Sequence, residues 1–318
     1  EKLSESSMPF IFKGGTSLLL LLQELRRLSI DIDIIVPKSV KIAEINEILK
    51  NIVRTSSFTR YEEQERHLSQ IPKAHFKLFY ESPFDQSEVY VLLDVLFEEN
   101  PYSRLDSTDI VCPFIDTIPP NVTVKVPSIA DILGDKLTAF APNTTGILYD
   151  KEKEMEIIKQ LFDIESLFDQ LSTTNGVKDT FIRCAEQELN YRQLTEMNYE
   201  NVLDDIFKTA IIIGGRGSFD KETFLKLENG IRRIKSHIIN RNYIVEEAVV
   251  SASKAAYLSM LLKHQQDEIE KYHPKETLPE LEGVPLFKKM AKIKNFSPEA
   301  YYYFAKAQEL IRRSEKTK

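Results

Sequence analysis

FKGGTSLLLLLQELRRLSIDIDIIV, residues 12–36, joins a glycine pair to an apolar segment and then to two aspartates set among isoleucines. The pattern predicts a strand at 10–13, a helix at 16–28 and a second strand at 31–36. Glycines let a backbone approach a phosphate closely, and the N-terminus of a helix presents unpaired N–H groups. Gly14 to Ser17 are therefore a candidate phosphate site, and an ordinary tight turn is the alternative.

The two aspartates of this stretch, Asp31 and Asp33, are predicted to share a face of their strand, because alternate residues of a strand do so. Close carboxylates repel each other unless a cation lies between them, and Mg²⁺ prefers carboxylate and phosphate oxygens. The pair therefore predicts a site for Mg²⁺ or Mn²⁺. Two exposed aspartates at a strand end are the alternative.

A third carboxylate lies in the run YVLLDVLFEE, residues 90–99. Asp94 stands there between apolar pairs, and a polar residue in a buried strand needs a structural or functional reason. If its strand lies beside that of Asp31 and Asp33, the three carboxylates could hold two metal ions. A surface position on an edge strand is the alternative.

The pattern along the chain changes from mixed to helical near residue 128. In the first part we predict a helix at 40–54 and further strands at 74–80, 88–99, 109–115 and 122–126. In the second part we predict helices at 128–141, 151–171, 177–194, 199–213, 220–240, 242–272 and 298–313. The expected fold class is α+β, with a mixed-sheet domain at 1–127 followed by an all-α domain at 128–318.

Composition limits the function classes. The chain has 318 residues, of which 42% are hydrophobic and 29% charged, which argues against a membrane protein. The net charge of −7 argues against coating nucleic acid by charge alone. Two distant cysteines, Cys112 and Cys184, fit a cytoplasmic location, and the five histidines show no metal-ligand spacing.

Four segments follow one another in a fixed order: KGGTSL (13–18), RLSIDID (27–33), ADILGDKLTAFAPNTTGI (130–147) and KQLFDIESLF (159–168). In this order and spacing, residues 12–168 resemble the nucleotidyltransferase toxins of the AbiEii/AbiGii family, which belong to the DNA polymerase β-like nucleotidyltransferase superfamily. The resemblance implies a polymerase β-like core, and it implies that the helical domain completes the active-site cleft.

The resemblance also implies roles for individual residues. The residues expected to bind the nucleotide are Lys13, Gly14, Gly15, Thr16, Ser17, Arg27 and Ser29. The residues expected to bind metal are Asp31, Asp33 and, by a looser correspondence, Asp94. Lys136 is expected to contact the triphosphate, and Asp94, or else Asp163, to assist deprotonation of the acceptor. Without the resemblance, Lys136 is an ordinary exposed helix lysine and Asp163 a partner for Lys159.

The implied activity is Mg²⁺-dependent transfer of a nucleotidyl group from an NTP to an acceptor hydroxyl. The implied biological role is that of the toxin in a type IV toxin–antitoxin pair or an abortive-infection system of phage defence. RNA, with the 3′ end of tRNA as the expected target, would be the acceptor, and a cognate antitoxin would be a protein partner. Two alternatives stay open: a nucleotidyltransferase that modifies a small molecule or a protein, and a catalytically silent nucleotide-binding or interaction protein.

Two further motifs have both a functional and a structural interpretation. GGRGSFD, residues 214–220, could bind phosphate through its backbone or simply connect two helices. YYYF, residues 301–304, could stack on bases or face the core.

Overall fold

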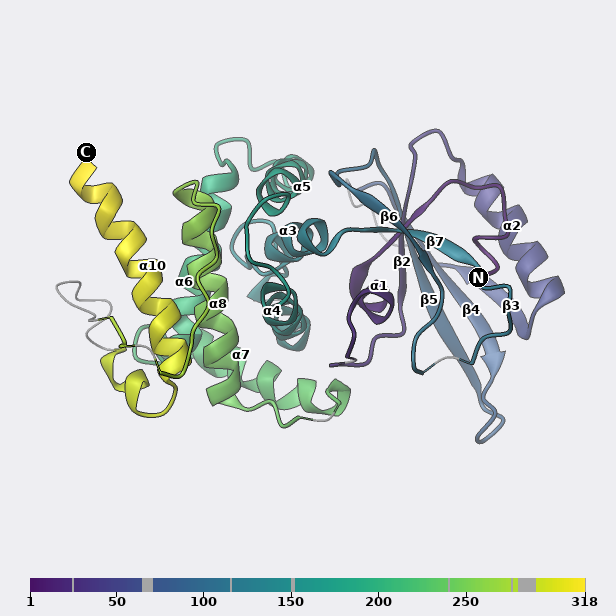
Figure 1. The fold of residues 1–318 in the computed structure, drawn as a ribbon. Helices are drawn as coiled ribbons and strands as arrows, with labels where there is room; N and C mark the ends of the chain where they lie inside the picture. The colour runs from purple at the N-terminus through teal and green to yellow at the C-terminus, as the bar shows by residue number, and fades with distance from the viewer. Residues whose placement is uncertain are drawn as a thin grey trace. The chain divides into compact units, whose positions relative to one another are not determined.

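The computed structural model describes residues 1–24, 26–64, 71–114, 116–149, 152–239, 241–275, 277–279 and 290–317. The chain divides into two compact units, Glu1–Ser128 and Ile129–Lys318 (Figure 1). Each unit has its own arrangement of secondary structure.

The first unit contains a five-stranded sheet in the order β1-β2-β5-β4-β3. Its strands are β1 (Ile11–Lys13), β2 (Ile32–Val36), β3 (Phe58–Glu63), β4 (Lys73–Glu81) and β5 (Glu88–Phe97). β2 pairs with β5 in parallel, and the other neighbours are antiparallel. The mixed sheet predicted from the sequence is therefore present.

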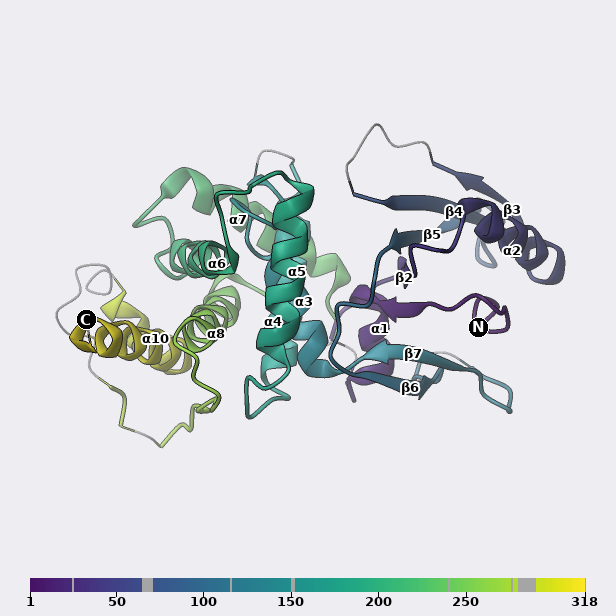
Figure 2. The same cartoon turned by 90° about the horizontal axis from the view of Figure 1, so that it is seen from above.

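One face of this sheet forms the main core of the unit. Helix α2 (Ile42–Thr55) runs along that face (Figure 1, Figure 2) and buries Ile45, Leu49 and Ile52 against it. The strands supply alternate residues to the same core, such as Ile34 and Val36 from β2. The residues that alternate with them, Asp33 and Ile35, consequently project from the opposite face of the sheet.

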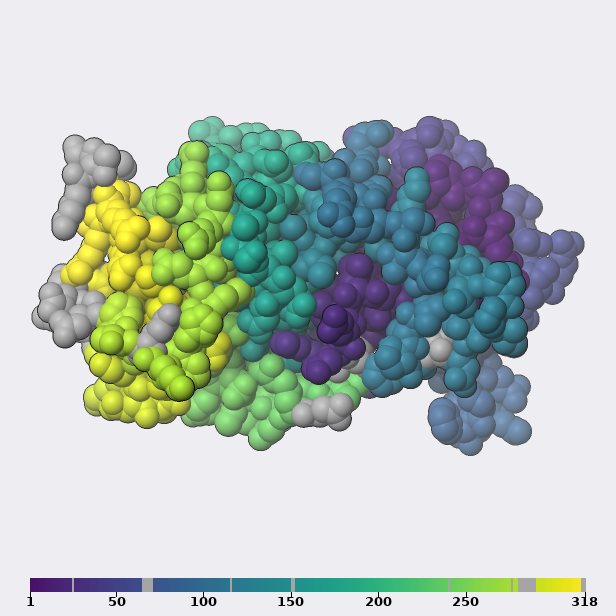
Figure 3. All heavy atoms as spheres, in the orientation of Figure 1, coloured from purple at the N-terminus to yellow at the C-terminus, as the bar shows by residue number. Residues whose placement is uncertain are grey.

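A two-stranded ladder accompanies the sheet. β6 (Leu105–Asp109) and β7 (Thr123–Pro127) pair antiparallel, and β7 lies beside β1. The connection between β4 and β5 projects from the surface of the first unit in the space-filling view (Figure 3). Phe84 in this connection is 97% exposed.

The named elements of the second unit are helices. They are α3 (Ile129–Ala139), α4 (Glu154–Phe168), α5 (Val177–Tyr191), α6 (Tyr199–Gly214), α7 (Lys221–Ile234), α8 (Val245–Lys263), α10 (Pro298–Thr317) and the short 3₁₀ helices η2 (Lys235–His237) and η3 (Ala291–Asn295). α8 is buried along most of its length, because α4, α6 and α10 all pack against it. Among the helices that the structure describes, each is too short or too polar to cross a bilayer.

Several predicted bounds were wrong. Helix α1 (Gly14–Leu21) starts at the glycines and ends well before residue 28, since the run of leucines carries no periodicity that marks an end. β3 was missed because a bulge between Phe58 and Arg60 breaks its alternation. The strand expected at 109–115 is instead the polar β6, which ends at Asp109; Ile115 lies outside the described residues. The helix expected at 242–272 extends only from Val245 to Lys263.

Candidate active site

A row of polar residues crosses the face of the sheet opposite to α2. Asp33 on β2 is paired in register with Lys13 on β1 and with Asp94 on β5. Asp94 is in turn paired with His75 on β4. Residues in register project from the same face, so the charged row, defined as Lys13, Asp33, Asp94 and His75, spans four adjacent strands.

The start of α1 lies directly against this row. Gly14 has φ of +78°, and a Cβ placed on it would come within 2.1 Å of Asp33 Oδ2. A Cβ on Gly15 would come within 2.5 Å of Arg27 Nη2 and 2.8 Å of Ser29 Oγ. Both glycines are therefore required for the first turn of α1 to approach these side chains.

The N-terminus of α1 is suited to an anion. Lys13, the N-cap residue, makes no side-chain capping hydrogen bond, and the first turn contains no acidic residue. Ser17 Oγ donates to the carbonyl oxygen of Gly14 at 2.8 Å, so the side chain of Ser17 points back into the turn. The first N–H groups of a helix carry partial positive charge and point outward, which favours a phosphate at this position.

Thr16 ties the segment before β2 to the same helix. Its Oγ1 lies 2.5 Å from the carbonyl oxygen of Asp31 and 3.0 Å from Ser29 Oγ, so it donates to the first and accepts from the second. Arg27 is 8% exposed, and its Nη1 donates to the carbonyl oxygen of Leu28 at 3.1 Å. The structure therefore brings the expected nucleotide-binding residues of the first unit together around the start of α1.

Asp31 departs from the expected position. β2 begins at Ile32, so Asp31 precedes the strand and is exposed, whereas Asp33 lies inside it and is partly buried. β5 does lie beside β2, which is the arrangement on which a role for Asp94 depends. The carboxylates that the sheet itself holds side by side are thus Asp33 and Asp94 rather than Asp31 and Asp33.

These two carboxylates fit a divalent cation that also takes substrate oxygens. Within the part of the chain that the structure describes, no group of three or more His, Cys, Asp or Glu side chains could hold a metal ion alone. Mg²⁺ often needs only one or two carboxylates, because phosphate oxygens and water complete its shell. Asp33, Asp94 and the exposed Asp31 therefore suit a metal that arrives with a nucleotide.

The second unit contains the two other expected residues as a buried ion pair. Lys136 on α3 and Asp163 on α4 lie 2.9 Å apart, with 10% and 2% of their side chains exposed. Lys136 Nζ also donates to Gln160 Oε1 at 3.1 Å. The alternative of an exposed lysine is wrong, because Lys136 is buried. Asp163 pairs with Lys136, and Lys159 pairs with Glu156.

The polar residue that sequence reasoning missed in this row is His75. Its Nδ1 lies 2.5 Å from Asp94 Oδ1, and the residue is 7% exposed. Histidine spacing along the chain gave no sign of it. The alternation in AHFKLFY, residues 74–80, does place His75 on the face away from Ala74 and Phe76, but the strand pairing was needed to bring it to Asp94.

The two remaining motifs have structural roles. GGRGSFD connects α6 to α7, as the structural alternative predicted. The YYYF residues of α10 are all buried, with exposures between 0% and 5%, so none presents a free face to a base.

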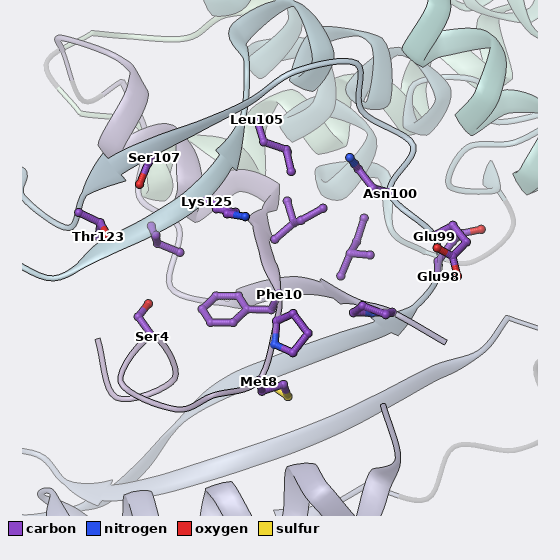
Figure 4. A pocket seen from close by; sticks show the side chains of 15 residues that line it. Ser4, Met8, Phe10, Glu98, Glu99, Asn100, Leu105, Ser107, Thr123 and Lys125 are labelled. Carbon is purple, nitrogen blue, oxygen red and sulfur yellow. The ribbon is translucent and has the colours of Figure 1, made fainter. Parts of the chain in front are cut away.

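A cavity of about 410 Å³ lies in the first unit (Figure 4), and its lining includes none of the four residues of the charged row. Phe10, Met8 and Leu105 give it apolar walls, and Lys125 and Glu98 add charge. It contains none of the residues expected to bind metal or nucleotide.

The chain belongs to the family described as "Nucleotidyl transferase AbiEii toxin, Type IV TA system", whose model matches residues 2–254. The resemblance of the sequence motifs is thereby confirmed, and the protein belongs to a class of enzymes that transfer phosphorus-containing groups.

Two solved structures from Helicobacter pylori are similar to the chain. JHP933 is 15% identical with a TM-score of 0.45, and the match covers 83% of this chain and 88% of that one. A putative nucleotidyltransferase is 12% identical with a TM-score of 0.44, covering 83% and 90%. No curated protein matches the chain.

Proposed function

We propose that this toxin-family protein catalyses Mg²⁺-dependent transfer of a nucleotidyl group from an NTP to a hydroxyl of RNA, with the 3′ end of tRNA as the acceptor. The observation that carries the proposal is the in-register pair of Asp33 and Asp94, beside the uncapped start of α1. The RNA acceptor and the phage-defence role rest on the family alone. A cytoplasmic location and a cognate antitoxin partner belong to the same proposal.

The residues of the first unit divide the work of binding. Asp33 and Asp94, with Asp31, would hold Mg²⁺, which when bound supplies positive charge to the phosphates and acidity to the attacking hydroxyl. The first N–H groups of α1 would bind phosphate oxygens. Lys13, opposite Asp33 in the ladder, would add positive charge at the same edge.

The reaction joins the acceptor oxygen to the α-phosphorus and breaks the bond from that phosphorus to the bridging oxygen, so pyrophosphate leaves. Asp94 would accept the proton of the acceptor hydroxyl. Lys136 would neutralise charge on the triphosphate. We assign Asp163 to the support of Lys136, since its carboxylate is 2% exposed and already paired with that ammonium.

A transfer assay tests the proposal. Each labelled NTP is incubated with purified tRNA, with total RNA, and with protein and small-molecule extracts, with and without Mg²⁺. We expect label in tRNA only when Mg²⁺ is present. Label confined to protein or to a small molecule would instead establish the first alternative function.

Two variants make the assay specific to the site. Asp33→Asn should lower transfer about 100-fold or more, because loss of a metal-binding carboxylate removes several kcal/mol of charge stabilisation. Asp109→Asn, an exposed aspartate at the end of β6, is the matched control and should leave transfer unchanged. If the wild-type chain transferred no label to any acceptor and Asp33→Asn left toxicity intact, the chain would be a catalytically silent binding protein.

A further inference from the structure

Among the residues that the structure describes, the His75 side chain makes one hydrogen bond, and its partner is a carboxylate of the charged row. Its Nδ1 lies 2.5 Å from Asp94 Oδ1, directly across the β4–β5 ladder. An ionised carboxylate only accepts hydrogen bonds, so Nδ1 carries the hydrogen and donates it. The residue is 7% exposed, which makes the contact a buried one on the histidine side.

The Asp94 carboxylate accepts a hydrogen bond at Oδ1, and its side chain is partly exposed. Its side chain is 29% exposed, in contrast to 9% for His75. In the part of the chain that the structure describes, the hydrogen bond from His75 is the one that the Asp94 side chain accepts. With Oδ1 occupied, the carboxylate cannot rotate freely about its χ angles, and Oδ2 is left for a cation or an acceptor hydroxyl.

The other carboxylate of the row is positioned by different means. Asp33 lies against Gly14, where a Cβ would come within 2.1 Å of its Oδ2, so the start of α1 limits its movement. Asp94, by contrast, lies inside β5, and its hydrogen-bond donor comes from the paired strand β4. A hydrogen bond from the neighbouring strand is the means available there.

We propose that His75 is a positioning residue that fixes the orientation of the Asp94 carboxylate for metal binding and transfer. This inference rests on the proposed function, because it requires Asp94 to act in the site. Hydrogen bonds to a metal-binding side chain typically change metal affinity or activity 10–100-fold when removed. The N–H donor at the Nδ1 position, rather than the imidazole ring of His75 as such, is what orients the Asp94 carboxylate.

Three substitutions of His75 distinguish the effect of its hydrogen-bond donor from that of its side-chain shape. The amide nitrogen of Asn can reach the position of Nδ1, whereas that of Gln extends further along the side chain. His75→Leu and His75→Gln should therefore weaken Mn²⁺ binding about 10–100-fold in the presence of a non-hydrolysable NTP analogue, measured by calorimetric titration of the full chain. His75→Asn should restore most of the affinity. His273→Leu, an exposed histidine, is the control.

A kinetic measurement gives a second readout. We expect His75→Leu to lower kcat and to raise the Mg²⁺ concentration for half-maximal rate by a similar factor, with little change in KM for the acceptor. Unfolding temperatures of all variants show whether the fold is retained. Equal metal affinity in His75→Leu and the wild type would overturn the inference, as would equal losses in His75→Asn and His75→Leu.

A double-substitution cycle distinguishes action through Asp94 from a general effect on the sheet. In an Asp94→Asn background, His75→Leu should cause little further loss of Mn²⁺ affinity, because the group it orients is gone. Full additivity of the two losses would overturn the inference. Failure of the proposed function gives another pattern: Asp33→Asn would retain transfer, whatever the His75 variants do.

Discussion

The buried ion pair of the second unit offers a quantitative test of how α3 and α4 are held together. Lys136 and Asp163 lie 2.9 Å apart, with side chains 10% and 2% exposed. At an effective dielectric constant of about 20, their attraction is about 6 kcal/mol, and the cost of removing both charges from water offsets much of it. The intact pair therefore stabilises the fold by less than the free energy that is lost when only one of its partners is removed.

Removing one partner should be more harmful than removing both. Lys136→Met or Asp163→Leu alone removes the ion-pair partner of a buried charge, and each should lower the free energy of unfolding by about 3–5 kcal/mol. The double variant removes both charges, so it should cost less than either single variant. The expected coupling energy is thus about 3 kcal/mol or more.

Urea unfolding followed by circular dichroism at 222 nm measures these differences, since helices dominate the second unit. Hydrogen exchange of α3 and α4 peptides gives a local measure of stability within the second unit. Lys159→Met is a matched control on α4, because its partner Glu156 is 38% exposed and such pairs contribute about 1 kcal/mol or less. Additive single effects, with a coupling energy near zero, would refute the reasoning.

Other substitutions test the glycine turn and a half-buried lysine. Gly14→Ala should lower the free energy of unfolding by about 1–2 kcal/mol because of its positive φ, and it should abolish most transfer because the new Cβ meets the Asp33 carboxylate. Gly217→Ala is the control: Gly217 also has a positive φ, of +83°, but its Cβ would meet only a Phe224 ring carbon at 3.4 Å. It should therefore cost similar stability and leave transfer intact. A transfer assay combined with urea unfolding distinguishes the two effects, and equal activity in both variants would contradict the reasoning. Burial lowers the pKa of Lys271 to about 8, so the unfolded chain binds more protons between about pH 8 and its ordinary value of 10.5, and stability should rise with pH across that window. Lys271→Met should lose this rise relative to the wild type in thermal unfolding measured from pH 7 to pH 10; an unchanged pH profile would show that the lysine is not buried as the structure has it.

Local patterns in the sequence predicted much of the fold. The alternation of Ile32, Ile34 and Val36 placed Asp33 on the opposite face, and the glycine pair marked the start of α1. Where apolar residues do not repeat at a regular period, the bounds failed. The leucine run concealed the end of α1, and the bulge in β3 concealed that strand.

The sequence by itself determined the family and the kinds of side chain in the candidate site, because order and spacing of motifs are properties of the chain alone. It could not determine which carboxylates are neighbours. Asp33 and Asp94 are brought together by parallel pairing of β2 with β5, and His75 is added by the register of β4. Register is fixed by burying one face of the sheet against α2, and a shift of a single residue would turn Asp94 into the core. That constraint exists only once the sheet and helix have packed.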